Sequence, residues 1–411
     1  MDAKEQFCSV EGNTVTEAAV CPVHHERDHP LQPPIGFAEA VSDGPVKMLW
    51  PNGVEAWVVS SYAGVRKVLS DPRFSTRKGG HPEMRTDDGE PVLDADQPGN
   101  INAIDGEAHL RLRRPLSRGF MVKRMNQLRP RIQQIVDEHL DAMEAKGAPA
   151  DLVSSLCLPL PSLVIAELLG VPPEHQELFQ ATAGEMFGKN GSKDEYLAHA
   201  TKLAEVLAPI VAAKKAAGTN DDLIGLMAND TDFSMEELIF LCIGLLAAGH
   251  ETTSNFLGLF TLHLFERPDQ LEVLRRDPGR ADVVVEELMR YTIGQLGGPG
   301  LTRRATEDVE VDGVLIKAGD WVSVSLMANL DEELCPRAGE LDLERDAVSH
   351  LGFGFGPHQC LGANLARAEL QIGLRSLFER FPDLRPAVPV TQLTYRNDMI
   401  TYGAAEIPVV W

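Results

Sequence analysis

Hydrophobic residues recur every three to four positions over most of this chain, a spacing that predicts amphipathic helices. The longest such stretch, 234–265, begins with Ser-Met-Glu-Glu, which matches a capping box, and ends before Pro268. Further helices are predicted over 62–70, 107–119, 127–146, 158–169, 174–188, 194–216, 222–229, 269–276, 281–293 and 361–380. The pattern is that of a mainly α protein.

Strand patterns are short. The segments 46–50 and 54–60 flank an Asn-Gly dipeptide, which predicts a β-hairpin. Residues 74–105 are rich in Gly, Pro and Asp and lack periodicity, so we expect a long loop that forms a lid or an insert. The Pro- and His-rich segment 1–44 is predicted to be an extended arm with a short helix. Other strands are expected at 309–311, 314–316, 321–325 and within 401–411.

Composition narrows the possible functions. With 411 residues and 44% hydrophobic content, the chain can bury a large core. Its net charge of −23 disfavours nucleic acids and anionic membranes as partners. The six cysteines form no Cys-x-x-Cys pair, which argues against a disulfide framework, a zinc ribbon and covalently attached haem. The start is polar, and the longest apolar run, 238–249, is shorter than the roughly 20 residues of a membrane span, so we expect a cytoplasmic protein.

The decapeptide 353–362, Phe-Gly-Phe-Gly-Pro-His-Gln-Cys-Leu-Gly, carries the most specific chemistry. Its glycines allow a tight loop and a close approach of backbone to a large flat ligand. Cys360 precedes a predicted helix, where amide N–H groups and the helix dipole stabilise a thiolate. A thiolate can ligate haem iron, although a lone cysteine is more often a buried structural residue.

This loop resembles the cysteine-ligand signature of the cytochrome P450 family, Phe-Gly-x-Gly-x-His/Arg-x-Cys-x-Gly. The resemblance implies that Cys360 is the axial ligand of haem b, in a loop bounded by Phe353 and Gly362. It also implies that His358 is a hydrogen-bond donor to a haem propionate. Haem would lie between the long helix and the helix after the cysteine loop.

The long helix contains Ala-Ala-Gly-His-Glu-Thr-Thr, which resembles the oxygen-activation motif of the same family. Ala248 and Thr252 lie one turn apart on one face, and the small residues 248 and 249 leave room for a planar cofactor. The resemblance makes Glu251 and Thr252 the proton-delivery pair. A structural alternative is that the hydroxyl simply bonds back to a helix carbonyl.

Two further sets of residues match the family's motifs. Glu287 and Arg290 form a Glu-x-x-Arg pair, with Arg345 in the position of its third member, and these three are expected to be structural. His109, Arg113 and Arg303 match the residues that hold the haem propionates. Taken singly, each of these cations could be a solvated surface group.

The resemblance implies a cytochrome P450 fold, helix-rich with a minor β part. We expect an N-terminal arm at 1–44 and a single domain at 45–411. Its β-rich part would comprise 45–72, 301–325 and 390–411, and its helical part 107–293 and 362–380. One departure is Ala-Asn-Leu-Asp at 328–331, where soluble bacterial members usually have Ala-Asn-Arg-Asp. A second is Cys335, where an aromatic residue is usual.

A basic cluster stands out in this acidic chain, and Glu107 is the only acid near it in the sequence. We expect it, with Arg367, to lie on the face where an acidic ferredoxin docks, with electrons supplied by an NAD(P)H-dependent ferredoxin reductase. The cluster comprises Arg111, Arg113, Arg114, Arg118, Lys123 and Arg124.

The predicted function is that of a monomeric haem-thiolate monooxygenase that hydroxylates or epoxidises a small organic molecule. By resemblance to actinobacterial secondary-metabolism members, a macrolide or other polyketide is the expected substrate. One alternative keeps the fold and acts as a peroxygenase or a nitric-oxide reductase. Another is a haem protein that binds a ligand without turnover.

Overall fold

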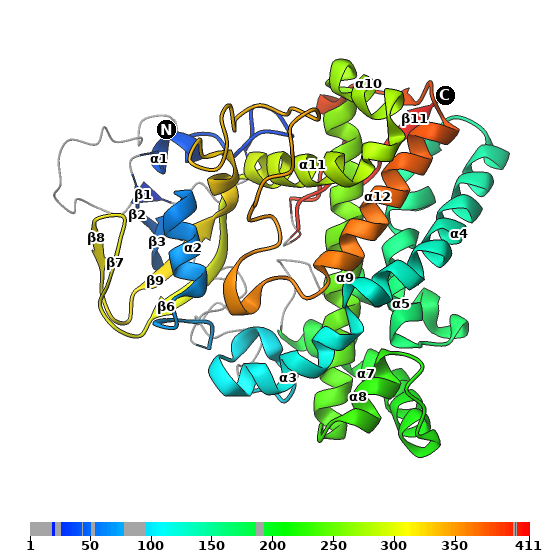
Figure 1. The fold of residues 1–411 in the computed structure, drawn as a ribbon, viewed down its shortest axis with the longest axis horizontal. Helices are drawn as coiled ribbons and strands as arrows, with labels where there is room; N and C mark the ends of the chain where they lie inside the picture. Colours follow the sequence, from blue (N-terminus) through cyan, green and yellow to red (C-terminus); the bar gives the residue numbers. More distant parts are fainter. Residues whose placement is uncertain are drawn as a thin grey trace.

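The computed structural model describes residues 19–20, 26–42, 44–50, 54–77, 96–185, 193–397, 399 and 401–411. A helical part surrounds the long helix α9 (Met235–Phe265), and a β-rich part lies to its left in Figure 1. Within the described residues, no helix is long and apolar enough to cross a membrane.

The helix α9 organises the helical part. Its N-terminus has the predicted capping box: Ser234 accepts from the Glu237 N–H, and the Glu237 carboxylate accepts from the Ser234 N–H. It is buried over most of its length because helices pack around it on several sides. They include α5 (Pro159–Leu169), α6 (Gln176–Glu185), α7 (Lys193–Ala217), α11 (Ala281–Leu296) and α12 (Ala363–Arg380).

Every predicted helix is present, with shifted ends in places. The largest shift is at α4 (Val122–Lys146), which begins five residues before the predicted start because the chain continues in helical form from the N-cap Met121. The predicted helix 174–188 begins as a 3-10 turn, and its residues beyond 185 lie outside the described part. The remaining helices are α1 (Phe37–Ala40), α2 (Tyr62–Ser70), α3 (Gly106–Gly119), α8 (Leu223–Asp230) and α10 (Pro268–Arg276).

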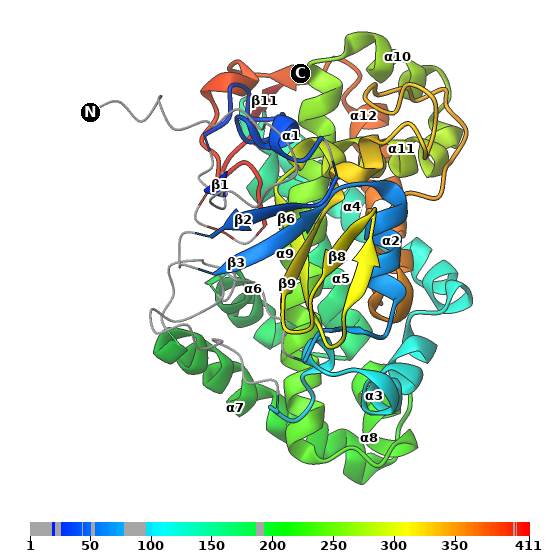
Figure 2. The same ribbon diagram turned by 90° about the vertical axis from the view of Figure 1, so that its left-hand side faces the viewer.

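The main sheet has six strands in the order β1-β2-β3-β9-β6-β4. The predicted hairpin is confirmed, since β2 and β3 pair antiparallel, although its turn residues 51–53 are not described. The arm adds an unpredicted parallel strand, β1, beside β2. Figure 2 looks onto this sheet, with α9 behind it. The strands are β1 (Ala19–Val20), β2 (Val46–Leu49), β3 (Glu55–Val59), β4 (Phe74–Ser75), β6 (Pro299–Ala305) and β9 (Trp321–Ser325).

Two small sheets complete the β structure. The predicted strands β7 (Val309–Val311) and β8 (Val314–Ile316) pair antiparallel. The strand β11 (Pro408–Val410) lies between β10 (Arg385–Pro386) and β5 (Ala150–Asp151). The tail strand is therefore shorter than the predicted 401–411, and it pairs with a segment from the predicted helical part.

Candidate active site

The cysteine loop is a tight turn that leads into α12. The Cys360 N–H donates to the Phe353 carbonyl over 2.8 Å, which closes the loop. Gly354 and Gly356 have φ of 71° and 74°, in the left-handed region. A Cβ on Gly356 would lie 2.4 Å from the Leu69 carbonyl oxygen, so the glycine is required for packing against α2.

The environment of the Cys360 thiol corrects one expectation. The predicted helix begins directly after Cys360, whereas α12 begins two residues later, at Ala363, after the N-cap Gly362. The thiol is exposed on the side of the site, but protein surrounds it elsewhere, and this burial raises its pKa. The Gly362 N–H, Arg113 and Arg367 act in the opposite direction and do not outweigh burial.

One exposed face of α9 carries small residues. A Cβ added to Gly244 would meet nothing within 4 Å, and Ala248, one turn later, is exposed. The Thr252 hydroxyl donates to the Ala248 carbonyl over 2.9 Å, the back-bonded arrangement of the structural alternative. Gly249 does not belong to this face: a Cβ there would lie 3.0 Å from Ile165 on α5, so its small size serves helix packing.

Glu251 is buried and points away from Thr252, toward the C-terminal turn. Its two carboxylate oxygens lie 3.4 and 3.3 Å from the Arg396 guanidinium, and the Asn255 amide donates to it over 3.4 Å. Asn255 in turn donates to the Thr401 hydroxyl over 3.0 Å. Burial raises the pKa of Glu251, and Arg396 and Asn255 oppose that rise. The acid and the hydroxyl, adjacent in sequence, thus have separate partners.

Two histidines from distant segments meet at the edge of the site. The rings of His109, on α3, and His358, in the cysteine loop, lie 4.1 Å apart. His358 lies 3.5 Å from the Asp105 carboxylate, which also accepts from Ser75 and Thr76. Burial lowers the pKa of His109 to about 4, and its buried Nε2 has no partner among the described residues.

Two arginines complete this edge. Arg303, on β6, is 6% exposed, and its only hydrogen bond within the described residues is to the Thr302 carbonyl, at 2.9 Å. Burial lowers its pKa to about 10, and Asp105 opposes this change. Arg113 donates to the Gln359 carbonyl beside the cysteine. Buried donors with unused capacity are the groups that would bind the two propionates of haem.

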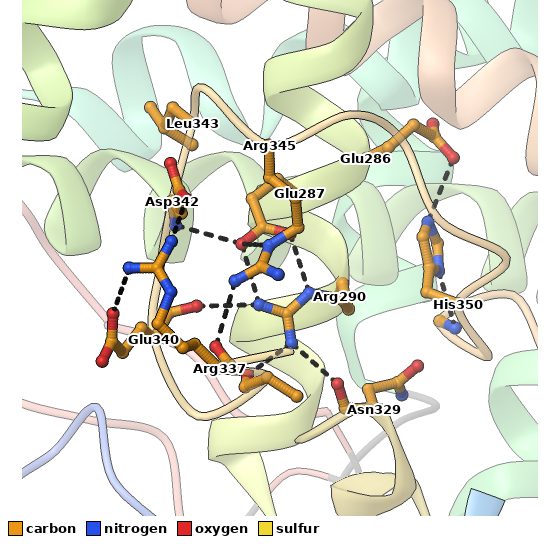
Figure 3. A network of polar contacts seen from close by, with 12 residues as sticks. Glu286, Glu287, Arg290, Asn329, Arg337, Glu340, Asp342, Leu343, Arg345 and His350 are labelled. Carbon is orange, nitrogen blue, oxygen red and sulfur yellow. Dashed lines mark hydrogen bonds and ion pairs between the residues drawn. The ribbon is translucent and has the colours of Figure 1, made fainter. Parts of the chain in front are cut away.

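The Glu-x-x-Arg residues form a buried network, shown in Figure 3. Arg290 makes two hydrogen bonds to the Glu287 carboxylate, of 2.7 and 2.8 Å, and Arg345 lies 3.3 Å from the same carboxylate. The remaining N–H groups of Arg290 donate to three carbonyls, those of Asn329, Ala338 and Glu340. The structure brings the three predicted residues together, away from the site itself.

The departure at Leu330 has a packing explanation. A Cβ added to Gly294 on α11 would lie 2.6 Å from Leu330 Cγ. Leu330 therefore fills the space that the glycine leaves on α11.

The basic cluster is less free than the sequence indicates. Arg111 forms ion pairs with Asp232 and Glu237, acids that are distant in sequence, and Arg124 donates to the Asp221 carbonyl. Within the described part of the chain, three exposed cations of the cluster form no ion pair: Arg114, Arg118 and Lys123. They surround the turn between α3 and α4, where Met121 and Val122 are more than half exposed.

Sequence reasoning missed several residues that contact the predicted ones. Arg396 and Asp105 carry no local signal, since they are identified only by their contacts with Glu251 and His358. Glu286 was missed because only its neighbour Glu287 belongs to the Glu-x-x-Arg pattern. Glu286 pairs with Arg367 and His350. Arg367 therefore already has an internal ion-pair partner, although its side chain remains 29% exposed.

The residues fit the implied cofactor. Cys360 is exposed, and one face of α9 is open at Gly244. The buried His109 Nε2 has no partner within the described residues, and the buried Arg303 is hydrogen-bonded there only to the Thr302 carbonyl. Cys360 would hold the iron, and His109, Arg113, Arg303 and His358 would hold the propionates. When bound through a thiolate, haem supplies the iron at which dioxygen is activated.

Comparison with known proteins agrees with this geometry. The family described as “Cytochrome P450” matches residues 281–391. Cytochrome P450-SOY of Streptomyces griseus is 40% identical over 392 residues, which cover 94% of each chain. The crystal structure of CYP105P1 in complex with filipin I has a TM-score of 0.87 and 39% identity, and the match covers 96% of this chain and 99% of that one.

A second solved structure is that of the LnmA cytochrome P450 hydroxylase from the leinamycin biosynthetic pathway of Streptomyces atroolivaceus S-140. It has a TM-score of 0.86 and 36% identity, and the match covers 96% of this chain and all of that one. The predicted fold, the haem b cofactor and the monooxygenase activity are confirmed by these matches. The chain belongs to the cytochrome P450 family.

Proposed function

We propose that this monooxygenase hydroxylates or epoxidises a macrolide or another polyketide-sized secondary metabolite. The single observation that carries the proposal is the open face of α9 at Gly244 and Ala248. Relatives support the substrate class, since one binds filipin I and another belongs to the leinamycin pathway. Residues 78–95, part of the predicted loop 74–105, and residues 186–192 lie outside the described part.

Each site residue has a proposed role. Cys360 ligates the haem iron, and Ala248 leaves room for the cofactor on the α9 side. Thr252 orients a proton at its hydroxyl, and Glu251 supplies that proton. Because burial raises the pKa of Glu251, its carboxyl group can carry a proton closer to neutral pH than an exposed glutamate. To reach Thr252, Glu251 must leave Arg396 and Asn255.

Electrons are proposed to come from a ferredoxin that docks on the turn between α3 and α4. The unpaired Arg114, Arg118 and Lys123 surround the exposed Met121 and Val122. An apolar centre with a cationic rim suits an acidic partner. Arg111 and Arg124 are less available, because both are already engaged within the chain.

The substrate class is tested by titrating the ferric holoenzyme with filipin I, macrolides, other polyketides, terpenoids and steroids. The readout is the shift of the Soret band that follows displacement of the iron-bound water. We expect a saturable shift with macrolides or other polyketides. A shift confined to terpenoids or steroids, or silence across the panel, would refute the proposed class.

A further inference from the structure

Behind the cysteine loop, a second charged cluster links α11 to α12. Glu286 accepts from Arg367 through both oxygens, with N–O distances of 2.7 and 2.8 Å. His350 lies 3.0 Å from the same carboxylate, to the right of the Arg290 network in Figure 3. The Glu-x-x-Arg pattern does not include this cluster, and none of the roles assigned above uses it.

The cluster has a fixed orientation. The His350 Nδ1 accepts from the Gly352 N–H over 3.0 Å, so its Nε2 carries the hydrogen that is donated to Glu286. Both Arg367 and His350 hold the Glu286 pKa near 2 against the effect of burial, and the carboxylate therefore remains ionised. A bidentate guanidinium–carboxylate pair is geometrically specific and holds both side chains in place.

The cluster reaches Cys360 through Phe353. The Arg367 guanidinium lies over the Phe353 ring, 4.3 Å from its centroid, and the His350 ring lies 5.9 Å from the same ring. The Phe353 carbonyl accepts the Cys360 N–H. Glu286 is thus connected to the Cys360 backbone through Arg367 and Phe353.

We propose that Glu286 is a positioning residue for electron donation by the Cys360 thiolate, and that with Arg367 it sets the reduction potential of the bound haem. The proposal rests on Cys360 as the iron ligand. The Arg367 charge favours the reduced form of the iron and weakens donation from sulfur, while Glu286 counters that charge. The pair therefore acts on the potential with opposite signs.

The test is spectroelectrochemical titration of holoenzyme variants at one pH and one ionic strength. We expect Glu286→Gln to shift the midpoint potential in the positive direction and Arg367→Gln to shift it in the negative direction. The double variant should lie near the parent. Arg367→Lys keeps the charge and loses the bidentate geometry, so a midpoint near the parent would assign the effect to charge. Asp282→Asn, an exposed charge change on the same helix, is the matched control and should leave the midpoint unchanged.

The directions of the two shifts in midpoint potential decide the outcome. If both single substitutions shift the midpoint in the same direction, the cluster only stiffens the loop, and the proposal is wrong; unchanged midpoints in both also overturn it. The CO-bound ferrous spectrum of the parent tests the underlying assignment separately. Absence of the thiolate-type band there would refute Cys360 as the ligand, whatever the variants do.

Discussion

The network around Arg290 and the region around α9 both bury polar groups, but they differ in how many of those groups have a hydrogen-bond partner. Arg290 uses all five of its N–H groups, on one carboxylate and three carbonyls. Near Glu251, the buried side chains of His250 and Ser254 have no hydrogen-bond partner within the described residues. His109 Nε2 and Thr302 Oγ1, near the residues that would hold the propionates, also have no hydrogen-bond partner within the described residues.

The difference in hydrogen bonding distinguishes residues that stabilise the fold from residues that can bind a cofactor or substrate. An unmade hydrogen bond in the interior costs about 1–3 kcal/mol, so a folded chain tolerates several of them mainly where function needs them. The chain completes the Arg290 network by itself. The α9 region retains donors and acceptors that a cofactor, a substrate or a transferred proton can engage.

The largest expected effect is a loss of stability when the Arg290 network is broken. Arg290→Met would leave Glu287 buried with only Arg345 as a charged partner, which should cost about 3–5 kcal/mol of unfolding free energy. The urea midpoint and the haem content after purification measure the loss. Arg337→Met, at an arginine that is 63% exposed, is the control and should change stability by about 1 kcal/mol or less. Equal losses of stability in Arg290→Met and Arg337→Met would show that the buried network stabilises the fold no more than an exposed ion pair.

The next largest effect is expected on kcat, from a substitution at Glu251 in the α9 region. Glu251→Gln keeps the size and polarity of the side chain but removes its transferable proton, so kcat should fall by about 10²-fold or more. Substrate affinity and the urea midpoint should stay close to those of the parent. Glu272→Gln, on the exposed face of α10, is the matched control. An unchanged kcat with a full solvent isotope effect would show that protons reach the site by another route.

Sequence patterns predicted the local features well, because those features depend on neighbours in the chain. Helices follow from apolar spacing, and the capping box at Ser234 needs only four residues. The cysteine loop needs glycine at Gly354 and Gly356, which is also visible locally. These predictions required no knowledge of how helices pack.

Long-range contacts could not be predicted in the same way. Glu251 and Arg396 are 145 residues apart, and their pairing depends on where the C-terminal turn lies against α9. The acids that engage Arg111 likewise come from the start of α9 and the residues before it. A two-residue parallel strand such as β1 leaves no periodic pattern to detect. Sequence therefore indicated which residues carry charge, and packing determined which of them are free.

A smaller, pH-dependent effect concerns Glu369 on α12. It is fully buried, and burial raises its pKa well above the usual value, although Thr253 on α9 opposes the rise. A raised pKa means that the folded state binds a proton that the unfolded state releases. Unfolding free energy should therefore fall by up to about 1.4 kcal/mol per pH unit above the ordinary glutamate pKa. Glu369→Gln should abolish that decline, as urea midpoints measured across pH would show.

The check on Glu369 is whether the decline of unfolding free energy with pH disappears in the Glu369→Gln variant. If the parent and Glu369→Gln lose stability in parallel as pH rises, another group causes the decline. Asp383→Asn, at an exposed position after α12, controls for the loss of one acid.

The smallest expected effect is at the docking surface. Arg118→Gln and Lys123→Gln each remove one exposed, unpaired charge, so each should weaken ferredoxin binding by only a few-fold, mainly through slower association at low salt. Raising the ionic strength should shrink the difference, because the charges are solvated. Arg111→Gln should slow association less, since Arg111 is already paired with Asp232 and Glu237. Stopped-flow reduction kinetics at two salt concentrations measure all three variants. A larger effect at Arg111 than at Arg118 would place the partner on the α8 side of α3 instead.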